Sequence, residues 1–161
     1  MPGVEVRIRR ADLQDVPSIV RLSEALFRED AGSRDPDMNL EWAAQEGRAY
    51  FAGLLGEVTA ACWLAEAVPD RGIVGYLATR LREGDSLVPL RVAMLESMYV
   101  HDQTRGRGVG TQLVEHFLSW AREQGAVRAS VTAYATNTDA VRFYEREGFY
   151  PKHLSLERDL G

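Results

Sequence analysis

The sequence predicts an α+β fold in which a mixed, mostly antiparallel sheet is covered by helices. Three observations lead to this prediction. Several segments show apolar–polar alternation or short apolar runs between turn residues, which is typical of strands, and others carry apolar residues at helical spacing. The strands between residues 58 and 100 follow one another through turns, as antiparallel hairpins do. Further along, strands and helices alternate, as they do in crossover connections.

The beginning of the chain predicts a strand followed by a helix. Val4, Val6 and Ile8 alternate with charged residues, which is the period-2 pattern of a half-buried strand. Asp12 is a suitable N-cap, and apolar residues recur at helical spacing over residues 13–27. The chain is therefore expected to open with a β-α unit.

A loop and a second helix come next. Residues 28–37 contain glycine and proline and predict a loop. Residues 40–55 again carry apolar side chains at helical spacing, up to Gly56, with Gly47 in their middle. Because glycine is a poor helix former, we expect the second helix to be interrupted at Gly47.

The middle of the chain predicts three antiparallel strands. Two apolar runs, 58–67 and 73–81, are joined by residues 68–72, whose proline and glycine suit a hairpin connection. A turn at residues 82–85 then leads to a third long strand over residues 90–100.

The last third predicts an alternation of helices and strands. A glycine-rich loop leads into a helix over about residues 108–124, a strand over 127–134, a helix over 138–147, and a last strand or pair of strands over 149–156. A glycine follows each of the two helices and ends it. The complete predicted order is β-α-α-β-β-β-α-β-α-β.

Size and charge argue against several classes of protein. The 161 residues (18.0 kDa) are expected to form a single domain over residues 1–161. A net charge of −5 and the lack of a basic stripe argue against a nucleic-acid partner. No secretory signal and no apolar stretch of about 20 residues is present, so a membrane is not expected and the predicted location is the cytoplasm.

The few cysteine and histidine residues do not suggest a metal centre. Cys62, the single cysteine, lies in an apolar run and is expected to be a buried structural thiol. The three histidines are far apart in the sequence and do not show zinc-ligand spacing. We therefore expect no metal.

The most informative local pattern is the loop Arg105-Gly106-Arg107-Gly108-Val109-Gly110, which precedes a helix. Its glycines allow backbone N–H groups to converge, and a helix N-terminus adds partial positive charge, so the loop suits a phosphate. A Walker loop would require a lysine that is absent here. A dinucleotide fingerprint would require wider glycine spacing and an acid at the end of the next strand. A helix capped by a glycine turn, without a ligand, is the alternative.

The loop resembles the Gln/Arg-x-x-Gly-x-Gly/Ala loop of the GCN5-related N-acetyltransferases (GNAT). Residues 137–149, Asn-Thr-Asp-Ala-Val-Arg-Phe-Tyr-Glu-Arg-Glu-Gly-Phe, resemble that family's second conserved region, Asn-x-x-Ala-x-x-Phe-Tyr-x-x-x-Gly-Phe. The order of the two motifs and of the elements also matches, so the resemblance covers nearly the whole chain. It implies a GNAT-like sheet with helices on both faces and an N-acetyltransferase that uses acetyl-CoA as cosubstrate.

The resemblance also assigns the coenzyme A contacts by position. The pyrophosphate should be held through backbone amides of one continuous segment: Arg105, Gly106, Arg107, Gly108, Val109, Gly110 and Thr111. The strand before this loop should offer backbone groups at Met98 and Val100 to the pantetheine arm and the acetyl carbonyl, in a gap where that strand and the next one splay apart. Asn137 should bond to the pantetheine arm, and Phe143 and Tyr144 should flank its sulfur.

Two side chains are candidates for proton transfer. Tyr144 could protonate the departing thiolate, since a phenol of pKa about 10 carries its proton at neutral pH; its alternative role is packing in the core. Glu96 lies in the apolar run 92–100, where a charge needs a use or a partner, and it resembles a glutamate proposed as a base in the polyamine-acetylating branch. By period 2 it should point to the side of Met98 and Val100, and its alternative role is an ion pair with an arginine.

The acceptor is expected to be a primary amine. Residues 29–47 carry six acidic residues against one arginine, and three of them, Asp35, Asp37 and Glu41, are here called the acidic lip. The lip would attract a cationic small molecule, aminoglycoside-like or polyamine-like, and the former would connect the protein with antibiotic resistance. A solvated surface is the other interpretation of these acids.

Transfer by direct attack in a ternary complex is expected, because no cysteine or serine stands beside a base as a covalent relay. Two alternatives stay open, acetylation of an amino-acid derivative or protein amine and a non-catalytic acyl-CoA sensor. A homodimer is the assembly that the resemblance implies.

Overall fold

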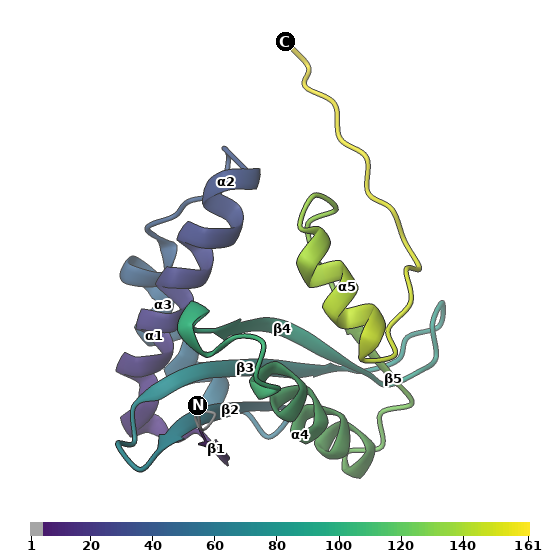
Figure 1. The fold of residues 1–161 in the computed structure, drawn as a ribbon. Helices are drawn as coiled ribbons and strands as arrows, with labels where there is room; N and C mark the ends of the chain where they lie inside the picture. Colours follow the sequence, from purple (N-terminus) through teal and green to yellow (C-terminus); the bar gives the residue numbers. More distant parts are fainter. Residues whose placement is uncertain (1–4) are drawn as a thin grey trace.

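The computed structural model describes residues 5–161 (Figure 1), and Val4 of the predicted first strand lies outside this range. The strands are β1 (Glu5–Arg10), β2 (Ala60–Val68), β3 (Ile73–Arg82), β4 (Val92–Val100) and β5 (Arg128–Val131). The helices are α1 (Val16–Leu26), α2 (Gly32–Arg34), α3 (Trp42–Leu55), α4 (Val109–Glu123) and α5 (Thr138–Arg146). Within residues 5–161 the strands form one sheet in the order β1-β2-β3-β4-β5. All pairs are antiparallel except β4–β5, which is parallel, so the predicted mixed sheet is confirmed.

Helices cover both faces of the sheet (Figure 1). On one face, α1 and α3 bury Ile19 and Phe51 against Tyr76 of β3. On the other face, α4 buries Phe117 against Leu77, the next residue along β3, and α5 packs its aromatic side chains beside the same cluster. Because neighbouring residues of a strand face opposite sides, the apolar run of β3 serves both cores.

The pairing of β4 is irregular on both of its sides. Ala78 of β3 pairs with Ser97 and Thr79 pairs with Leu95, so Glu96 is an extra residue in a β-bulge. On the other side, the parallel pairing with β5 ends at Leu95 and Val131. Within residues 5–161, β4 therefore has a strand partner from Glu96 to Val100 only on the side of β3. Its open side is the side of β5, where the resemblance implies that the two strands splay apart.

The first helix is longer and less regular than predicted. Asp12 and Asp15 form a capping box at a short 3-10 turn (η1, Leu13–Asp15), which confirms the N-cap. After α1, a π-helical turn (η2, Phe27–Ala31) leads directly into α2. The predicted loop over residues 28–37 is therefore wrong up to Arg34. The local glycine suggested a loop, but Gly32 has helical dihedral angles here.

The expected interruption of the second helix is also wrong. α3 continues through Gly47, which is buried. A Cβ at Gly47 would lie 3.4 Å from the Val20 Cγ2 of α1, so the missing side chain permits close contact between the two helices. Tertiary packing here outweighs the low intrinsic helix propensity of glycine.

The last predicted strand, over residues 149–156, is absent from the described chain. Residues 150–161 run extended away from α5 (the yellow segment in Figure 1), and all of them are exposed. Their apolar–polar alternation fits a strand, but a strand also needs a partner for its backbone groups, and Pro151 has no N–H to donate. The β5 strand is shorter than predicted because the chain leaves β4 after Val131.

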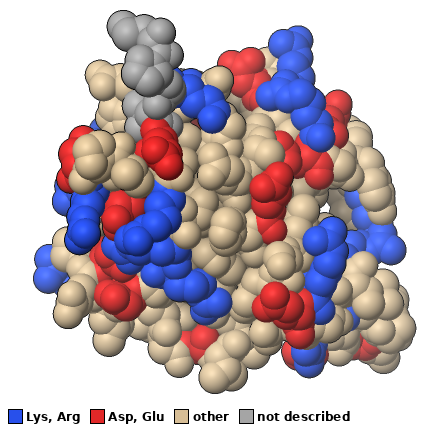
Figure 2. All heavy atoms as spheres, turned by 60° about the horizontal axis from the view of Figure 1, so that its bottom comes forward, with Lys and Arg blue, Asp and Glu red and all other residues tan. Residues whose placement is uncertain are grey.

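The surface and the core agree with the simple properties of the sequence. Acidic and basic side chains are interspersed on the face shown in Figure 2. Cys62 is buried as predicted, and burial raises the pKa of its thiol to about 12. Among residues 5–161, no helix combines the length and the apolarity that crossing a membrane requires.

Candidate functional site

The glycine loop joins β4 to α4 through residues in the left-handed backbone region. Gly106 has φ +75° and Gly108, the N-cap of α4, has φ +79°. No atom lies within 4 Å of a Cβ built on either residue, so the glycines are required here by the backbone and not by crowding.

The backbone donors of this loop have no partner within the described chain. The first intrahelical bond of α4 runs from the N–H of Gln112 to the oxygen of Gly108. The N–H groups of residues 106–111 donate no hydrogen bond to any residue between 5 and 161. Unpartnered N–H groups at a helix N-terminus are a general anion site, so the loop fits the pyrophosphate of coenzyme A.

The side chains of the loop have other partners. Arg105 donates from Nε to the oxygen of Val100 at 2.8 Å and pairs through its terminal nitrogen with Glu29 of η2. This pairing with Arg105 lowers the pKa of the Glu29 carboxyl. The Thr111 hydroxyl donates to the carboxylate of Glu147 at 2.6 Å. The side chains of Arg105 and Thr111 thus have partners within the protein, and the backbone N–H groups of this loop remain for a phosphate.

The open edge of β4 presents the backbone groups of Met98 and Val100. His101 donates its N–H to Val74 of β3, and alternate residues of an antiparallel strand point their polar groups to opposite neighbours. The polar groups of Val100 and Met98 therefore point away from β3, and the oxygen of Val100 is indeed reached by Arg105. An extended pantetheine arm could pair with this edge as an added strand would.

Asn137 begins α5 and reaches across to the first helical segment. Its Oδ1 accepts from the N–H of Ala140 at 3.2 Å as an N-cap, and its Nδ2 donates to Asp30 of η2 at 2.9 Å. Nearby, the Tyr134 hydroxyl donates to Asp35 at 3.0 Å. The segments around Asp30 and Asp35 are thus tied to the residues that follow β5.

A small hollow lies between these two segments. It has a volume of about 290 Å³ and is lined by Asp30, Thr132, Ala133 and Tyr134. Asp30 also forms an ion pair with Arg34, one turn further along, at 3.1 Å. A carboxylate beside a small cavity is suited to a cationic group.

Phe143 and Tyr144 lie side by side on α5, with ring centroids 5.2 Å apart. A Cβ at Gly110 would lie 3.1 Å from the Cζ of Phe143, so the glycine allows α5 to approach the first turn of α4 closely. Burial raises the pKa of Tyr144 to about 12, and the charge of Asp30 adds to the shift. The phenol therefore keeps its proton across the physiological range and can serve as a donor.

Glu96 is held in a polar cluster on the face covered by α3. Its carboxylate accepts a hydrogen bond from the Tyr50 hydroxyl of α3. Nη1 of Arg80, on β3, donates to both carboxylate oxygens, at 2.9 and 3.0 Å. Arg80 also pairs with Glu57 at 2.9 Å, and its guanidinium lies 5.0 Å from the ring centroid of Tyr50. Burial, followed by the hydrogen bond to Glu96, raises the pKa of Tyr50.

The expected orientation of Glu96 is wrong. Met98 and Val100 pack against the cluster beneath α4, whereas Glu96 bonds to Tyr50 on the opposite face. The bulge at Glu96 shifts the alternation by one residue, so the simple period-2 rule fails across it. The ion pair with an arginine, given above as the alternative for Glu96, is present.

The acidic lip is only partly joined to this site. Asp35 bonds to Tyr134, and its other oxygen accepts from the N–H of Asp37 at 3.1 Å. Asp37 and Glu41 are exposed.

The side chains that sequence reasoning missed are Glu29, Asp30, Tyr134, Arg80 and Tyr50. The one available signal was the acidic run containing Glu29 and Asp30, because the partners of the other three are set by the tertiary fold.

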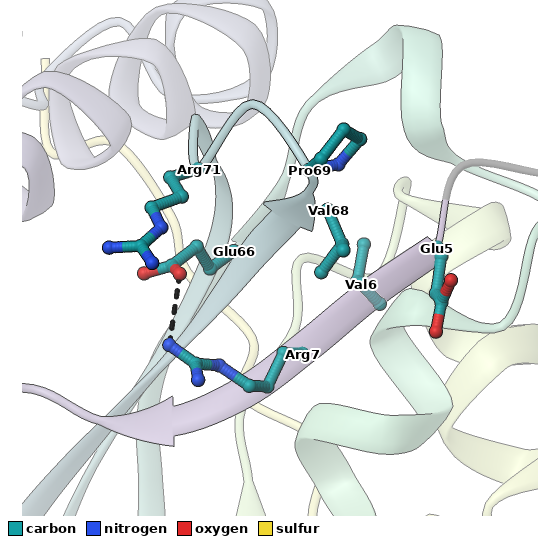
Figure 3. A pocket seen from close by; sticks show the side chains of 7 residues that line it. All are labelled: Glu5, Val6, Arg7, Glu66, Val68, Pro69 and Arg71. Carbon is teal, nitrogen blue, oxygen red and sulfur yellow. Dashed lines mark hydrogen bonds and ion pairs between the residues drawn. The ribbon is translucent and has the colours of Figure 1, made fainter.

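A second hollow, of about 530 Å³, lies at the far edge of the sheet (Figure 3). It is lined by Glu5, Val6, Arg7, Glu66, Val68, Pro69 and Arg71. Arg7 pairs with Glu66 there at 3.0 Å. None of these residues belongs to the predicted site.

Residues 5–161 contain no group of three His, Cys, Asp or Glu side chains arranged to hold a metal ion.

The comparison with protein families gives a direct result. Residues 17–149 match the model of the acetyltransferase (GNAT) family, and the chain belongs to that family. An uncharacterized N-acetyltransferase of Archaeoglobus fulgidus is 30% identical over 142 residues, which cover 86% of this chain and 89% of that protein. The protein is thus an acetyl-CoA-dependent N-acetyltransferase, and the resemblance found in its motifs is confirmed.

Other relatives differ in coverage. An N-alpha-acetyltransferase of Sulfurisphaera tokodaii is 27% identical over 153 residues, covering 91% of this chain and 81% of that protein. An uncharacterized N-acetyltransferase of Methanocaldococcus jannaschii is 28% identical over 81 residues, covering 50% of this chain and 36% of that protein.

Solved structures confirm the fold. The aminoglycoside N-acetyltransferase AAC(6')-Iy, crystallised with CoA, superposes with a TM-score of 0.76 at 20% identity over 99% of this chain and 98% of that one. A predicted acetyltransferase of Clostridium acetobutylicum, crystallised with acetyl-CoA, gives a TM-score of 0.75 at 19% identity, with 97% of each chain covered. At these identities the likeness concerns the fold.

Proposed function

We propose that this protein transfers an acetyl group from acetyl-CoA to a primary amine of a small cationic acceptor. The observation that carries the proposal is the hollow lined by Asp30, Thr132, Ala133 and Tyr134, because a carboxylate there can hold an ammonium group. The charge of Asp30 also acts on the phenol of Tyr144, so the hollow is electrostatically coupled to the candidate general acid. The acidic segment of the first helices supports the same class of acceptor.

The chemistry follows from the placement of the residues. The neutral amine attacks the acetyl carbonyl, the C–N bond forms, and the C–S bond breaks. Tyr144 donates its phenolic proton to the departing thiolate. The amine must lose a proton, and Glu96 is proposed as the base. To accept this proton, the Glu96 carboxylate exchanges a hydrogen bond from Tyr50 or Arg80 for one from the amine. A covalent relay through Cys62 is disfavoured, because that thiol is buried and its pKa is raised to about 12.

A second candidate acceptor is an amino-acid derivative or a protein amine. The relatives from Sulfurisphaera tokodaii and Saccharomyces cerevisiae that are named N-alpha-acetyltransferases favour it. A non-catalytic acyl-CoA sensor is the candidate from another class. The presence of both Tyr144 and Glu96 argues against it.

One experiment separates the three. Thiol release from acetyl-CoA is measured across polyamines, aminoglycosides, amino-acid derivatives and short peptides, with coenzyme A binding measured by calorimetry in parallel. Turnover highest with polyamines or aminoglycosides supports the proposal. Turnover highest with peptides supports the second candidate, and binding without turnover supports a sensor.

The acidic lip is tested with the best acceptor. Replacing Asp35→Asn, Asp37→Asn and Glu41→Gln together should raise KM, and the effect should fade in high salt, since exposed charges are screened over roughly 10 Å at 0.1 M. The matched control neutralises three acids outside the site, Glu115→Gln, Glu123→Gln and Asp70→Asn, and should leave KM unchanged. An unchanged KM in the lip variant at low salt would make these acids a solvated surface.

A further inference from the structure

Two side chains of the glycine loop that could donate to a phosphate are held by carboxylates. The loop has three such side-chain donors, Arg105, Arg107 and Thr111. The guanidinium of Arg105, at the start of the loop, pairs with Glu29 of η2. The hydroxyl of Thr111, at its end, donates to Glu147 at 2.6 Å. Arg107, between them, is exposed. The two outer donors are thus engaged by acids from two other parts of the chain.

Glu147 reaches Thr111 because the end of α5 lies against the first turn of α4. Phe143, one helical turn before Glu147, is the residue that a Cβ at Gly110 would meet at 3.1 Å. A threonine hydroxyl has one proton, and here Glu147 accepts it. The phosphates of coenzyme A offer only acceptors to a hydroxyl at neutral pH. Thr111 therefore cannot donate to them while its proton is bound to Glu147.

Glu29 holds Arg105 along β4. One oxygen of the Glu29 carboxylate pairs with the guanidinium of Arg105, and the other accepts from the Tyr99 hydroxyl at 3.1 Å. The guanidinium lies 5.2 Å from the ring centroid of Tyr99, and its Nε donates to the oxygen of Val100 at 2.8 Å. Arg105 is thereby packed against the end of the strand, and its charge is compensated before any ligand arrives.

We propose that Glu29 and Glu147 are positioning residues that limit the affinity for coenzyme A, because they hold Arg105 and Thr111 away from its phosphates. The proposal rests on the assignment of the glycine loop to the pyrophosphate and does not involve the acceptor. Its consequence is opposite to that of a residue that binds the ligand, since loss of either carboxylate should tighten binding. A product that is bound less tightly leaves sooner, so the two acids favour release of coenzyme A after transfer.

The affinity of two isosteric variants tests the proposal. Glu29→Gln and Glu147→Gln keep the size of the side chain and remove its charge. In Glu147→Gln the amide can donate to the Thr111 oxygen, which leaves the hydroxyl proton for a phosphate. Calorimetric titration with coenzyme A should give a Kd lowered by about threefold to tenfold in each variant, the fold-change that one net hydrogen bond provides. KM for acetyl-CoA should fall in parallel, whereas loss of a merely structural contact would raise both constants.

The control variant Glu145→Gln removes the same charge from a nearby position. Glu145 is exposed on α5, two residues before Glu147, so it does not share the helix face that meets α4. Kd for coenzyme A should stay unchanged in this variant. Scanning fluorimetry of the three glutamine variants shows that each is folded at the temperature of the titration.

Double-mutant cycles show whether each acid acts through its partner. Thr111→Val keeps the shape of the side chain and removes its hydroxyl, so Glu147→Gln should no longer tighten binding in that background. In the same way, Glu29→Gln should have no effect once Arg105→Met has removed the guanidinium. A gain that stays equally large without the hydroxyl or the guanidinium would mean that the acids act only by repelling the phosphates.

Three results would overturn the proposal: an unchanged or raised Kd in Glu29→Gln and Glu147→Gln, an equal gain in Glu145→Gln, or a gain that persists in both partner-deleted backgrounds. A failure of the loop assignment itself looks different, because Gly108→Glu would then bind coenzyme A as the wild type does. The choice of acceptor is decided separately by turnover across the amines.

Discussion

Two substitutions of Gly108, the N-cap of α4, test the phosphate assignment. One changes only the backbone conformation, and the other also adds a negative charge. Gly108 has φ +79°, and an alanine Cβ there would meet no atom within 4 Å. Gly108→Ala should therefore lower the unfolding free energy by about 1–2 kcal/mol, which is the cost of placing a Cβ-bearing residue in the left-handed backbone region. For a domain of this size each kcal/mol lowers Tm by roughly 2–4 °C, so a decrease of about 2–8 °C is expected.

Gly108→Glu adds a negative charge to the same strained position. Two unit charges 4 Å apart interact by about 1 kcal/mol in water and about 4 kcal/mol near a protein surface. A carboxylate beside the pyrophosphate should thus weaken coenzyme A binding at least tenfold, since a factor of ten corresponds to about 1.4 kcal/mol. The loss of stability should resemble that of Gly108→Ala, and the loss of affinity should be larger.

Gly125→Ala is the matched control, because Gly125 has φ +76° at the other end of α4 and an alanine there makes only ordinary contact with Arg91, at 3.8 Å. Its Tm should fall as in Gly108→Ala, with coenzyme A affinity unchanged. Calorimetric titration gives the affinity and scanning fluorimetry the Tm. If Gly108→Glu binds coenzyme A as the wild type does, the loop does not hold the phosphates. An equal loss of affinity in Gly125→Ala would trace the effect to α4 as a whole.

Three further predictions concern proton transfer and stability. Tyr144→Phe should reduce turnover by about 10²-fold with coenzyme A binding kept, and wild-type turnover under rate-limiting chemistry would leave the tyrosine as packing. Glu96→Gln should impair turnover most near neutral pH and less as pH approaches the pKa of the amine, whereas a defect constant with pH would mean that Glu96 only holds Arg80 and Tyr50. Asp15 accepts two hydrogen bonds of 2.8 Å from Arg9, which lowers the pKa of the Asp15 carboxyl. Asp15→Asn should cost about 2 kcal/mol in urea unfolding at pH 7. The difference from wild type should begin to shrink as pH falls through 3.8, where the unfolded chain takes up the proton, and should be lost once pH falls through the lowered pKa of the native carboxyl; a difference that does not shrink below pH 3.8 would argue against the ion pair.

The family and most of the fold could be predicted from local sequence patterns. Strand alternation, the capping box at Asp12 and the glycines that end α4 and α5 depend on residues close together in the chain, so the sequence contains the whole signal. The same holds for the glycine loop, whose left-handed residues and unpartnered N–H groups follow from Gly106 and Gly108.

Elements that depend on distant contacts were predicted less well. Helix α3 passes through Gly47 because Val20 of α1 packs there. The sequence of residues 149–156 has the pattern of a strand, but within residues 5–161 this segment pairs with no strand of the sheet. In both cases a local preference was decided by a neighbour far away in sequence.

The sequence by itself determined the family and the glycine loop before α4, and it indicated Tyr144 as the candidate acid, because motif residues lie at fixed short spacings. Only the tertiary structure decided which charges meet. The bulge in β4 turns Glu96 toward Tyr50 and Arg80, and η2 brings Asp30 to Asn137. These pairs are separated by between 16 and 107 residues along the chain, and their meeting is set by strand register and helix packing, which no local pattern records.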